Sequence, residues 1–429
     1  MGNKISKFMN EKVLPLGMKI GGQRHLLAIR DGMAASIPLI IVGSIFLIIG
    51  NLPIPGYTEF VAGIFGADWT VKLDYAVNAT FSIMALICVF AISNSLANKY
   101  SVDGVSAGFI SLAAFLVVTP LTADGGIPLA YMGSKGLFVA IVVSLVSTEI
   151  FRFMVQKDIV IKMPENVPPA VSKSFVALIP SILTVTLFWV IRLIVEATGF
   201  GNIHEIIAVI LGGPLSYLGG GYVGGLVAIL ITSLFWTVGI HGWDLVLSVM
   251  QPTYMLMLDQ NRVAFQAGAE IPNIINYSFY NVFVWMGGSG VLIAIAVLLI
   301  LRSRSRQMKE LAKIAVPPTV FGVNEPLMFG FPIVMNPIMI IPYVLAPVVV
   351  FTISYAAMYF KIVPMTNGVM VPWTMPPLIG GYLATGSIKG TLLQLVNIII
   401  SVAIYYPFFK IADDTAYAIE NKKTSAIDA

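Results

Sequence analysis

Residues 37–50 read Ile-Pro-Leu-Ile-Ile-Val-Gly-Ser-Ile-Phe-Leu-Ile-Ile-Gly, a stretch without one charged side chain. It ends an apolar run that begins near residue 31 and has about 20 residues, the length of an α-helix that spans a bilayer. Similar runs recur at about 77–97, 104–119, 136–155, 174–197, 220–240, 243–258, 280–301, 338–359 and 389–411. Because only helices satisfy their backbone hydrogen bonds within one segment in lipid, the sequence predicts an all-α polytopic membrane protein with about ten transmembrane helices.

The composition of the chain is too apolar for a soluble protein. Hydrophobic residues make up 58% of the 429, charged residues make up 11%, and the mean hydropathy is +0.90. Soluble proteins carry about 25% charged residues, and their single cores stop growing near about 250–300 residues. The excess therefore indicates a chain dissolved in lipid.

Positive charges gather in a few segments between the apolar runs. They lie in residues 4–30, 157–162, 302–313 and 422–423. Cytoplasmic loops are enriched in Lys and Arg, and crossings that start inside place all these segments in the cytoplasm, with residues 198–219 outside. Both termini are therefore expected in the cytoplasm. No basic run is interleaved with exposed aromatic residues, so we expect no nucleic-acid partner.

The two halves of the chain differ in how continuous their apolar runs are. Residues 29–200 contain uninterrupted spans, whereas residues 201–415 are repeatedly broken by Pro, Gly and polar residues. Irregular backbone at membrane depth survives only where protein buries it or where it lines a watery cavity, and transporters place their binding sites there. We therefore predict two re-entrant hairpins, near 320–335 and 366–380, and a substrate site in this half.

The two ends of the chain differ from the spans. Residues 1–28 alternate apolar and basic side chains at roughly helical spacing, which predicts an interfacial amphipathic helix on the cytoplasmic side. A solvated basic N-terminus is an equally good interpretation. Residues 416–429 are predicted to form a cytoplasmic tail.

Glu325 is the only charged residue between Lys313 and Lys361, and it lies in Val-Asn-Glu-Pro, residues 323–326. Ionisable groups inside membrane segments are costly and are functional candidates by default. A simpler interpretation is that Asn324 and Glu325 cap a half-helix, since the following proline suits a first helical turn. Half-helices that start in a cavity also bind polar ligands, so we expect both residues to contact substrate.

His241 closes a long apolar run and is the second candidate. A lone histidine is often structural, but a carboxylate, an amide and an imidazole together suit the hydroxyls of a sugar. The indoles of Trp236 and Trp373 would then cover the apolar faces of the sugar rings, although each alone is equally typical of the aromatic belt at a membrane interface. Asp244 is placed to orient the imidazole.

Nothing in the sequence calls for a cofactor. The histidines and Cys88 lack the spacing of metal ligands, and no Gly-x-x-x-x-Gly-Lys-Ser/Thr segment occurs. Cys88 lies within an apolar run and is expected to pack in the core. We therefore expect neither a metal site nor ATP hydrolysis.

Six segments resemble the lactose/cellobiose/chitobiose class of phosphotransferase-system sugar permeases, in the same order along the chain from about residue 12 to residue 411. They are Lys19-Ile-Gly-Gly-Gln-Arg-His-Leu-Leu-Ala-Ile-Arg-Asp-Gly, Met163-Pro-Glu-Asn-Val-Pro-Pro, Gly239-Ile-His-Gly, Gly287-Gly-Ser-Gly, Phe321-Gly-Val-Asn-Glu-Pro-Leu-Met-Phe-Gly-Phe-Pro and Pro372-Trp-Thr-Met-Pro. The block around Asn-Glu-Pro is the specific one. The resemblance is closest to the diacetylchitobiose member, although cellobiose carriers share nearly all these motifs.

This resemblance implies a membrane (IIC) component of the bacterial cytoplasmic membrane, a homodimer formed largely through the N-terminal spans. In that class a IIB protein transfers phosphate from a phosphocysteine to the 6-hydroxyl of the bound sugar, supplied through IIA and HPr. By motif, Glu325 would contact that hydroxyl, either as a ligand alone or also as its base, and His241 would stabilise the developing charge. With no IIB-like segment in the chain, IIB is expected to be separate, and the chain takes part in phosphotransfer only with it.

The expected substrate is a β-linked disaccharide, diacetylchitobiose first and cellobiose or lactose next. The main alternative is a cation-coupled secondary sugar transporter, in which Glu325 would carry a proton. A lipid-linked membrane enzyme would need several acidic residues at a membrane face. Only Asp413 and Asp414 stand together, at the end of the last span, where we expect simple cytoplasmic exposure.

Overall fold

The computed structural model describes residues 11, 14–52, 56–164, 166–331, 333–334 and 336–427. All regular secondary structure within these ranges is helical, which confirms the predicted all-α class. The first half contains α2 (Leu14–Gly21), α3 (Arg24–Ala34), α4 (Ile37–Gly50), α5 (Tyr57–Phe65), α6 (Trp69–Asn78), α7 (Met84–Lys99), α8 (Gly104–Val118), α9 (Leu129–Met132), α10 (Leu137–Gln156) and α11 (Pro169–Glu196). The second half contains α12 (Ile203–Ile207), α13 (Gly213–Gly220), α14 (Tyr222–Trp236), α15 (Gly242–Gln266), α16 (Tyr277–Phe279), α17 (Ile293–Arg302), α18 (Arg306–Val320), α19 (Glu325–Gly330), α20 (Pro337–Tyr359), α21 (Ile379–Thr385) and α22 (Ile388–Ile427).

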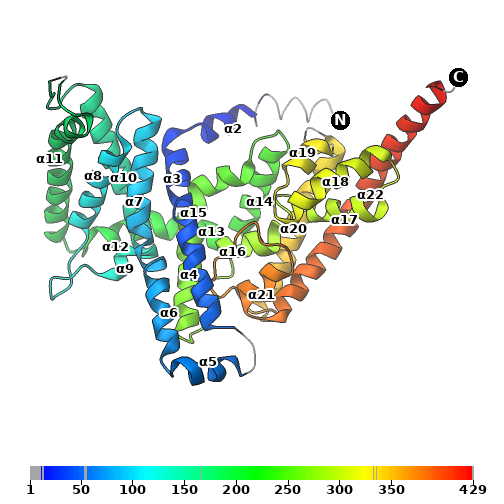
Figure 1. The fold of residues 1–429 in the computed structure, drawn as a ribbon, viewed down its shortest axis with the longest axis horizontal. Coiled ribbons are helices and arrows are strands. Elements are labelled where there is room, and N and C mark those ends of the chain that lie inside the picture. The colour runs from blue at the N-terminus through cyan, green and yellow to red at the C-terminus, as the bar shows by residue number, and fades with distance from the viewer. Residues whose placement is uncertain are drawn as a thin grey trace.

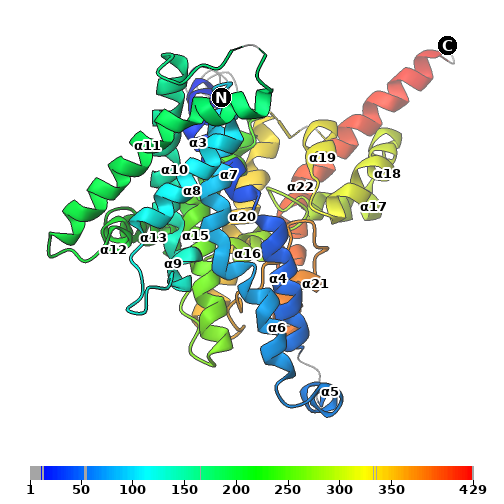
Figure 2. The same ribbon diagram turned by 60° about the vertical axis from the view of Figure 1, so that its left-hand side comes forward.

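The long helices agree with a membrane protein that crosses the bilayer many times. Seven helical stretches among the described residues are long and apolar enough to span it: Arg24–Gly50, Trp69–Lys99, Ser134–Gln156, Pro169–Glu196, Ile203–Gly220, Ile338–Tyr359 and Ile388–Asn421. Three shorter apolar helices, α8, α14 and α17, complete this set. In Figure 1, α2 and the C-terminal end of α22 lie at the top of the molecule and α5 lies at the bottom. Figure 2 shows the end of α22 and α5 at the same opposite ends.

One predicted span and one predicted external loop need correction. The run 280–301 is not one helix: a π-helical turn ends at Val284, and α17 begins only at Ile293. The residues between contain Gly287, Gly288 and Gly290, all with φ between 71° and 90°, a conformation that a helix cannot include. Residues 203–220, expected outside the ten spans, form α12, a π-helical turn and α13.

α15 covers the predicted span 243–258 and continues to Gln266. It is less apolar than the other long helices, because it carries Asp244, Asp259 and Arg262. The last two form an ion pair whose side chains are only 10% and 7% exposed. The helix lies in the middle of the molecule against α3 and α14, so protein rather than lipid surrounds most of it.

Both predicted hairpins involve broken helices. α18 and α19 pack against each other around a turn at residues 321–324. α18 runs through Pro317 and Pro318, although we attributed the breaks in this half of the chain in part to proline. Since the helix ends only three residues later, at Val320, these prolines remove hydrogen bonds from its last turns alone.

The second hairpin has a non-helical arm, residues 361–378, that returns into α21. Residues 366–371 of this arm are buried, and polar side chains of other elements bond to their backbone. The amide of Met370 donates to Ser44 Oγ (2.8 Å), and Ser278 Oγ donates to the carbonyl of Val369 (2.8 Å) and accepts from the amide of Val371 (3.2 Å). Irregular backbone thus lies inside the protein with its polar groups satisfied.

The chain ends extend the predicted elements. Residues 1–10, 12 and 13 of the predicted amphipathic segment lie outside the described residues, and α2 covers part of the remainder. The last span and the predicted tail form one helix, since α22 continues to Ile427. We expected Asp413 to be exposed, but it is buried. Its carboxylate accepts hydrogen bonds from the amides of Arg304 (2.9 Å) and Ser305 (3.1 Å).

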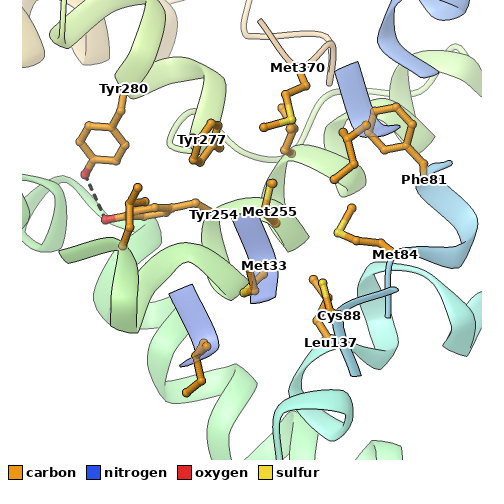
Figure 3. Packing of buried hydrophobic residues seen from close by; sticks show 14 of the residues in the cluster. Met33, Phe81, Met84, Cys88, Leu137, Tyr254, Met255, Tyr277, Tyr280 and Met370 are labelled. Carbon is orange, nitrogen blue, oxygen red and sulfur yellow. Dashed lines mark hydrogen bonds between the residues drawn. The ribbon is translucent and has the colours of Figure 1, made fainter. Parts of the chain in front are cut away.

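The hydrophobic core joins the two halves. Figure 3 shows Met33 of α3 among Met84 and Cys88 of α7 and Tyr254 and Met255 of α15. Cys88 is free and fully buried, as predicted. Because α3 packs on both α7 and α15, it connects the N-terminal bundle with the half that carries the site.

Candidate functional site

A cavity of about 580 Å³ lies where α3, α15, the turn after Trp285, the α18–α19 turn and the second hairpin meet. Four of the five predicted site residues line it: Asn324, Glu325, His241 and Trp373. They come from three separate parts of the chain, and the fold brings them together.

Trp236 does not line this cavity. Its indole is buried, with 3% exposed, and its ring lies behind that of His241 with the centroids 4.5 Å apart. It therefore supports the imidazole, and a direct contact between Trp236 and a sugar is not what this arrangement favours.

Asn324 and Glu325 are placed by the start of α19. Asn324 precedes the helix, but its side chain does not cap it; instead Nδ2 donates to the carbonyl of Ser289 (3.2 Å). Glu325 is the first helical residue, and its side chain is exposed at the cavity. An exposed carboxylate at this position is free to accept a hydrogen bond from a ligand hydroxyl.

Two glycines make these placements possible. Gly288 has φ +90°, and a Cβ there would lie 2.5 Å from Cγ of Asn324. Gly322 has φ +82°, and a Cβ there would lie 2.6 Å from the carbonyl oxygen of Trp373. Both positions combine a left-handed backbone with a close approach, so only glycine fits without strain.

His241 caps the N-terminus of α15. Its Nδ1 accepts from the amide of Asp244 (3.1 Å), and this bond requires an unprotonated Nδ1. The neutral imidazole then carries its proton on Nε2 as a donor. Nδ1 also lies 3.3 Å from Asp244 Oδ1, a contact that becomes favourable only in the imidazolium form. Asp244 thus orients the ring in either state, at the position predicted for it.

Three buried polar atoms in the cavity wall lack a protein partner within the described part of the chain. They are Gln251 Oε1, Asn281 Nδ2 and Trp285 Nε1. A buried polar group without a hydrogen bond costs about 1–3 kcal/mol. Around them lie aromatic rings, with the centroids of Trp243 and Trp285 5.4 Å apart. Unmatched donors and acceptors beside aromatic surfaces suit a ligand that has many hydroxyls and an apolar face.

Residues 30–347 match the family model described as phosphotransferase system, EIIC. The chain belongs to the phosphotransferase-system EIIC family.

Several proteins are similar to this EIIC chain over nearly all of its length. The lichenan permease IIC component of Bacillus subtilis is 51% identical and covers 98% of this chain and 96% of its own. The cellobiose-specific EIIC component of Geobacillus stearothermophilus is 50% identical, with coverages of 97% and 96%. Among solved structures, the transporter ChbC, the IIC component from the N,N'-diacetylchitobiose-specific phosphotransferase system, superposes with a TM-score of 0.94 at 47% identity, covering 96% of this chain and 99% of its own.

Sequence reasoning missed several residues of this EIIC cavity. Gln251, Asn281 and Trp285 all lie in runs that we interpreted as ordinary spans. Arg30 was noted as a basic residue of the N-terminal segment and as part of a family motif, but not as a site residue. The available signal was the presence of amides within otherwise apolar helices. Within the described residues, no cluster of His, Cys, Asp and Glu is arranged to hold a metal ion.

Proposed function

We propose that this EIIC protein binds a β-linked disaccharide in the cavity between α3, α15 and α19 and carries it across the bacterial cytoplasmic membrane. The observation that carries the proposal is the convergence of Glu325, Asn324, His241 and Trp373 on one cavity. Glu325 and Asn324 would bind hydroxyls, and Trp373, which is 51% exposed, would cover a ring face.

Diacetylchitobiose is our first candidate substrate, followed by cellobiose and then lactose. The sequence motifs, which resemble the diacetylchitobiose member most, put that sugar first. The relatives, at 47% identity for ChbC and 50% for the cellobiose-specific protein, support only the placing of lactose last. ChbC is specific for diacetylchitobiose, the Geobacillus relative is named for cellobiose, and the lactose-specific EIICB component of Streptococcus mutans is only 31% identical. All three sugars offer the hydroxyls that these side chains suit.

The bound sugar would be phosphorylated on its 6-hydroxyl by a IIB component that carries a phosphocysteine supplied through IIA and HPr. The hydroxyl oxygen attacks phosphorus, the S–P bond breaks, an O–P bond forms, and cysteine leaves as thiolate. Glu325 would accept the hydroxyl proton, and the Nε2–H of His241 would stabilise negative charge on the transferring group. Once it has released this proton, the Glu325 carboxylate repels the charged product, which favours release of the product.

Equilibrium binding by calorimetry tests the assignment of the site. Purified protein is titrated with diacetylchitobiose, cellobiose and lactose, and the titrations are repeated with Glu325→Gln and His241→Ala. We expect one disaccharide to bind and its affinity to fall about tenfold or more in at least one variant, as expected for the loss of a hydrogen bond to a charged group. Unchanged binding in both variants would refute the site.

A cation-coupled transporter remains the second candidate, in which Glu325 would bind a proton. Transport into vesicles distinguishes the two mechanisms. A coupled carrier takes up sugar without phosphoenolpyruvate and stops when the proton gradient is dissipated. The phosphotransferase mechanism requires phosphoenolpyruvate and IIB.

We also propose a homodimer formed through residues 29–200, on the basis of the family resemblance alone.

A further inference from the structure

A second, smaller cavity of about 130 Å³ lies beneath α2, on the other side of one wall of the sugar cavity. Three residues line both cavities and so form the wall between them: Arg30, His241 and Asp244. Apart from these, its lining contains Ser248 as its one polar side chain among the described residues. A phosphoryl group transferred near His241 would therefore lie close to the charged side chains of Arg30 and Asp244.

Arg30 is held so that one end of its guanidinium remains available. Its Nε and Nη2 donate to Asp31 Oδ1 at 3.0 and 2.7 Å, and Lys99 Nζ donates to the other carboxylate oxygen of Asp31 at 2.7 Å. Its Nη1 has only a long contact of 3.4 Å to Asp244 Oδ2. Asp31 and Lys99 thus fix the guanidinium, while Nη1 is weakly engaged at the wall.

Most of the charges that line the cavity are negative, so a phosphoryl group that enters it needs a positively charged side chain to bind it. Three carboxylates, those of Asp31, Asp244 and Glu325, line the sugar cavity, and Arg30 is the one Lys or Arg among its described lining residues. A phosphoryl group adds further negative charge. Arginine binds phosphoryl oxygens with short, charge-assisted hydrogen bonds, and its planar fork fits them better than an ammonium does.

We propose that Arg30 binds the phosphoryl group during its transfer to the sugar, with Nη1 exchanging its long contact to Asp244 for a phosphoryl oxygen. This inference rests on the proposed function. In the transfer the S–P bond of the donor breaks, the O–P bond to the sugar forms, the hydroxyl proton passes to Glu325 and the thiolate leaves. Arg30 neutralises the oxygens of the moving group, and the amide of Asp244 keeps its hydrogen bond to Nδ1 of His241.

The test compares binding of a disaccharide with binding of its 6-phosphate, and uses Arg30→Gln, Arg30→Lys and the control Arg304→Gln. Arg304 is exposed, pairs with Asp414 and lines neither cavity. We expect Arg30→Gln to bind the neutral disaccharide as the wild type does, and to lose about tenfold in affinity for the 6-phosphate and in the rate of phosphotransfer from phosphorylated IIB. Arg30→Lys should show a smaller loss of both, and Arg304→Gln none.

Glu325→Gln should have the opposite effect to Arg30→Gln. Removing a carboxylate should raise the affinity for the 6-phosphate relative to the affinity for the neutral sugar. An equal loss for both ligands in Arg30→Gln and Arg30→Lys would overturn the proposal, since it marks a structural role. The proposal would also be overturned if Arg30→Gln left the ratio of the affinities for the 6-phosphate and the neutral disaccharide unchanged. If no disaccharide binds even to the wild type, the proposed function itself fails, which is distinguishable from failure at Arg30 alone.

Discussion

Asn324 is held against the turn after Trp285 by a single contact to the backbone, its bond to the carbonyl of Ser289. That contact exists because Gly288 has no side chain, since a Cβ would overlap Asn324. The position of the amide, and with it the start of α19, therefore depends on a residue outside the Val-Asn-Glu-Pro segment.

Gly288→Ala tests this dependence. We expect a destabilisation of about 1–3 kcal/mol from the left-handed backbone, and an additional loss of disaccharide affinity because Asn324 must move. Thermal unfolding in detergent and calorimetry measure the two effects. Gly63→Ala in α5 is the matched control: a Cβ there meets nothing within 4 Å and its φ is not positive, so neither quantity should fall. Wild-type affinity in Gly288→Ala would contradict the account.

Two of the site residues that the sequence predicted share one property. Glu325 and His241 were recognisable because an ionisable group in an apolar region is costly wherever its helix points. Gln251 and Asn281 were not, since a neutral amide in a helix can face lipid, a neighbour or a cavity, and only the packing decides. Trp236 was assigned to the sugar because an indole can cover the apolar face of a sugar ring, whereas the fold places it behind the His241 ring.

At the scale of elements, α22 holds the hairpin that carries Glu325. Asp413 accepts from two amides at the α17–α18 turn, and Glu420 accepts from Ser305 Oγ (2.6 Å) and from the amides of Arg306 (3.0 Å) and Gln307 (2.8 Å). These carboxylates fix the first turn of α18, where backbone donors lack helical partners. α18 leads directly into the turn before α19. The hydrogen bonds that Asp413 and Glu420 accept at the start of α18, which we call the clasp, therefore help to position the candidate site from a distance.

Asp413→Asn should weaken this clasp. Loss of charge-assisted bonds to buried amides costs about 1.5–3 kcal/mol, and the hairpin should open more often. Hydrogen exchange of residues 306–330 is expected to accelerate, with a smaller loss of sugar affinity. Its neighbour supplies the control, since Asp414 is more exposed and pairs with the exposed Arg304. Equal exchange in Asp413→Asn and Asp414→Asn would argue against a positioning role.

The order of the elements was largely predictable, because long apolar runs have few alternatives in lipid. The failures have local causes. Three glycines with positive φ break the run at 280–301, and the charge pattern could not reveal them. The arm at 361–378 was recognised as irregular from its prolines, but its path depends on bonds from Ser44 and Ser278, which lie far away in sequence.

At the scale of the whole molecule, the two halves meet at the site. α3 belongs to the first half, yet Arg30 contacts Asp244 of α15, and the same helix packs into the core shown in Figure 3. Any movement of the proposed sugar site against the N-terminal bundle must therefore break or remake contacts along α3. The coupling of binding to transport is expected to pass through this helix.

The orientation of the molecule can be measured with single cysteines. Cys88 is buried, so a Cys88→Ser protein is a silent background. Lys309→Cys in α18 and Phe60→Cys in α5 place exposed thiols in two elements that lie far apart in Figure 1. A membrane-impermeant maleimide should label position 309 only from the cytoplasmic side and position 60 only from outside. The reverse pattern would invert the predicted topology.

Phosphotransfer by Glu325→Gln tests the central claim most directly. The variant is loaded with the disaccharide that calorimetry identifies, phosphorylated IIB is added, and formation of the sugar 6-phosphate is measured in a single turnover. We predict that the variant still binds sugar but transfers phosphate at least about a hundredfold more slowly than the wild type, the usual contribution of a positioned base. Transfer at the wild-type rate would contradict the role assigned to Glu325.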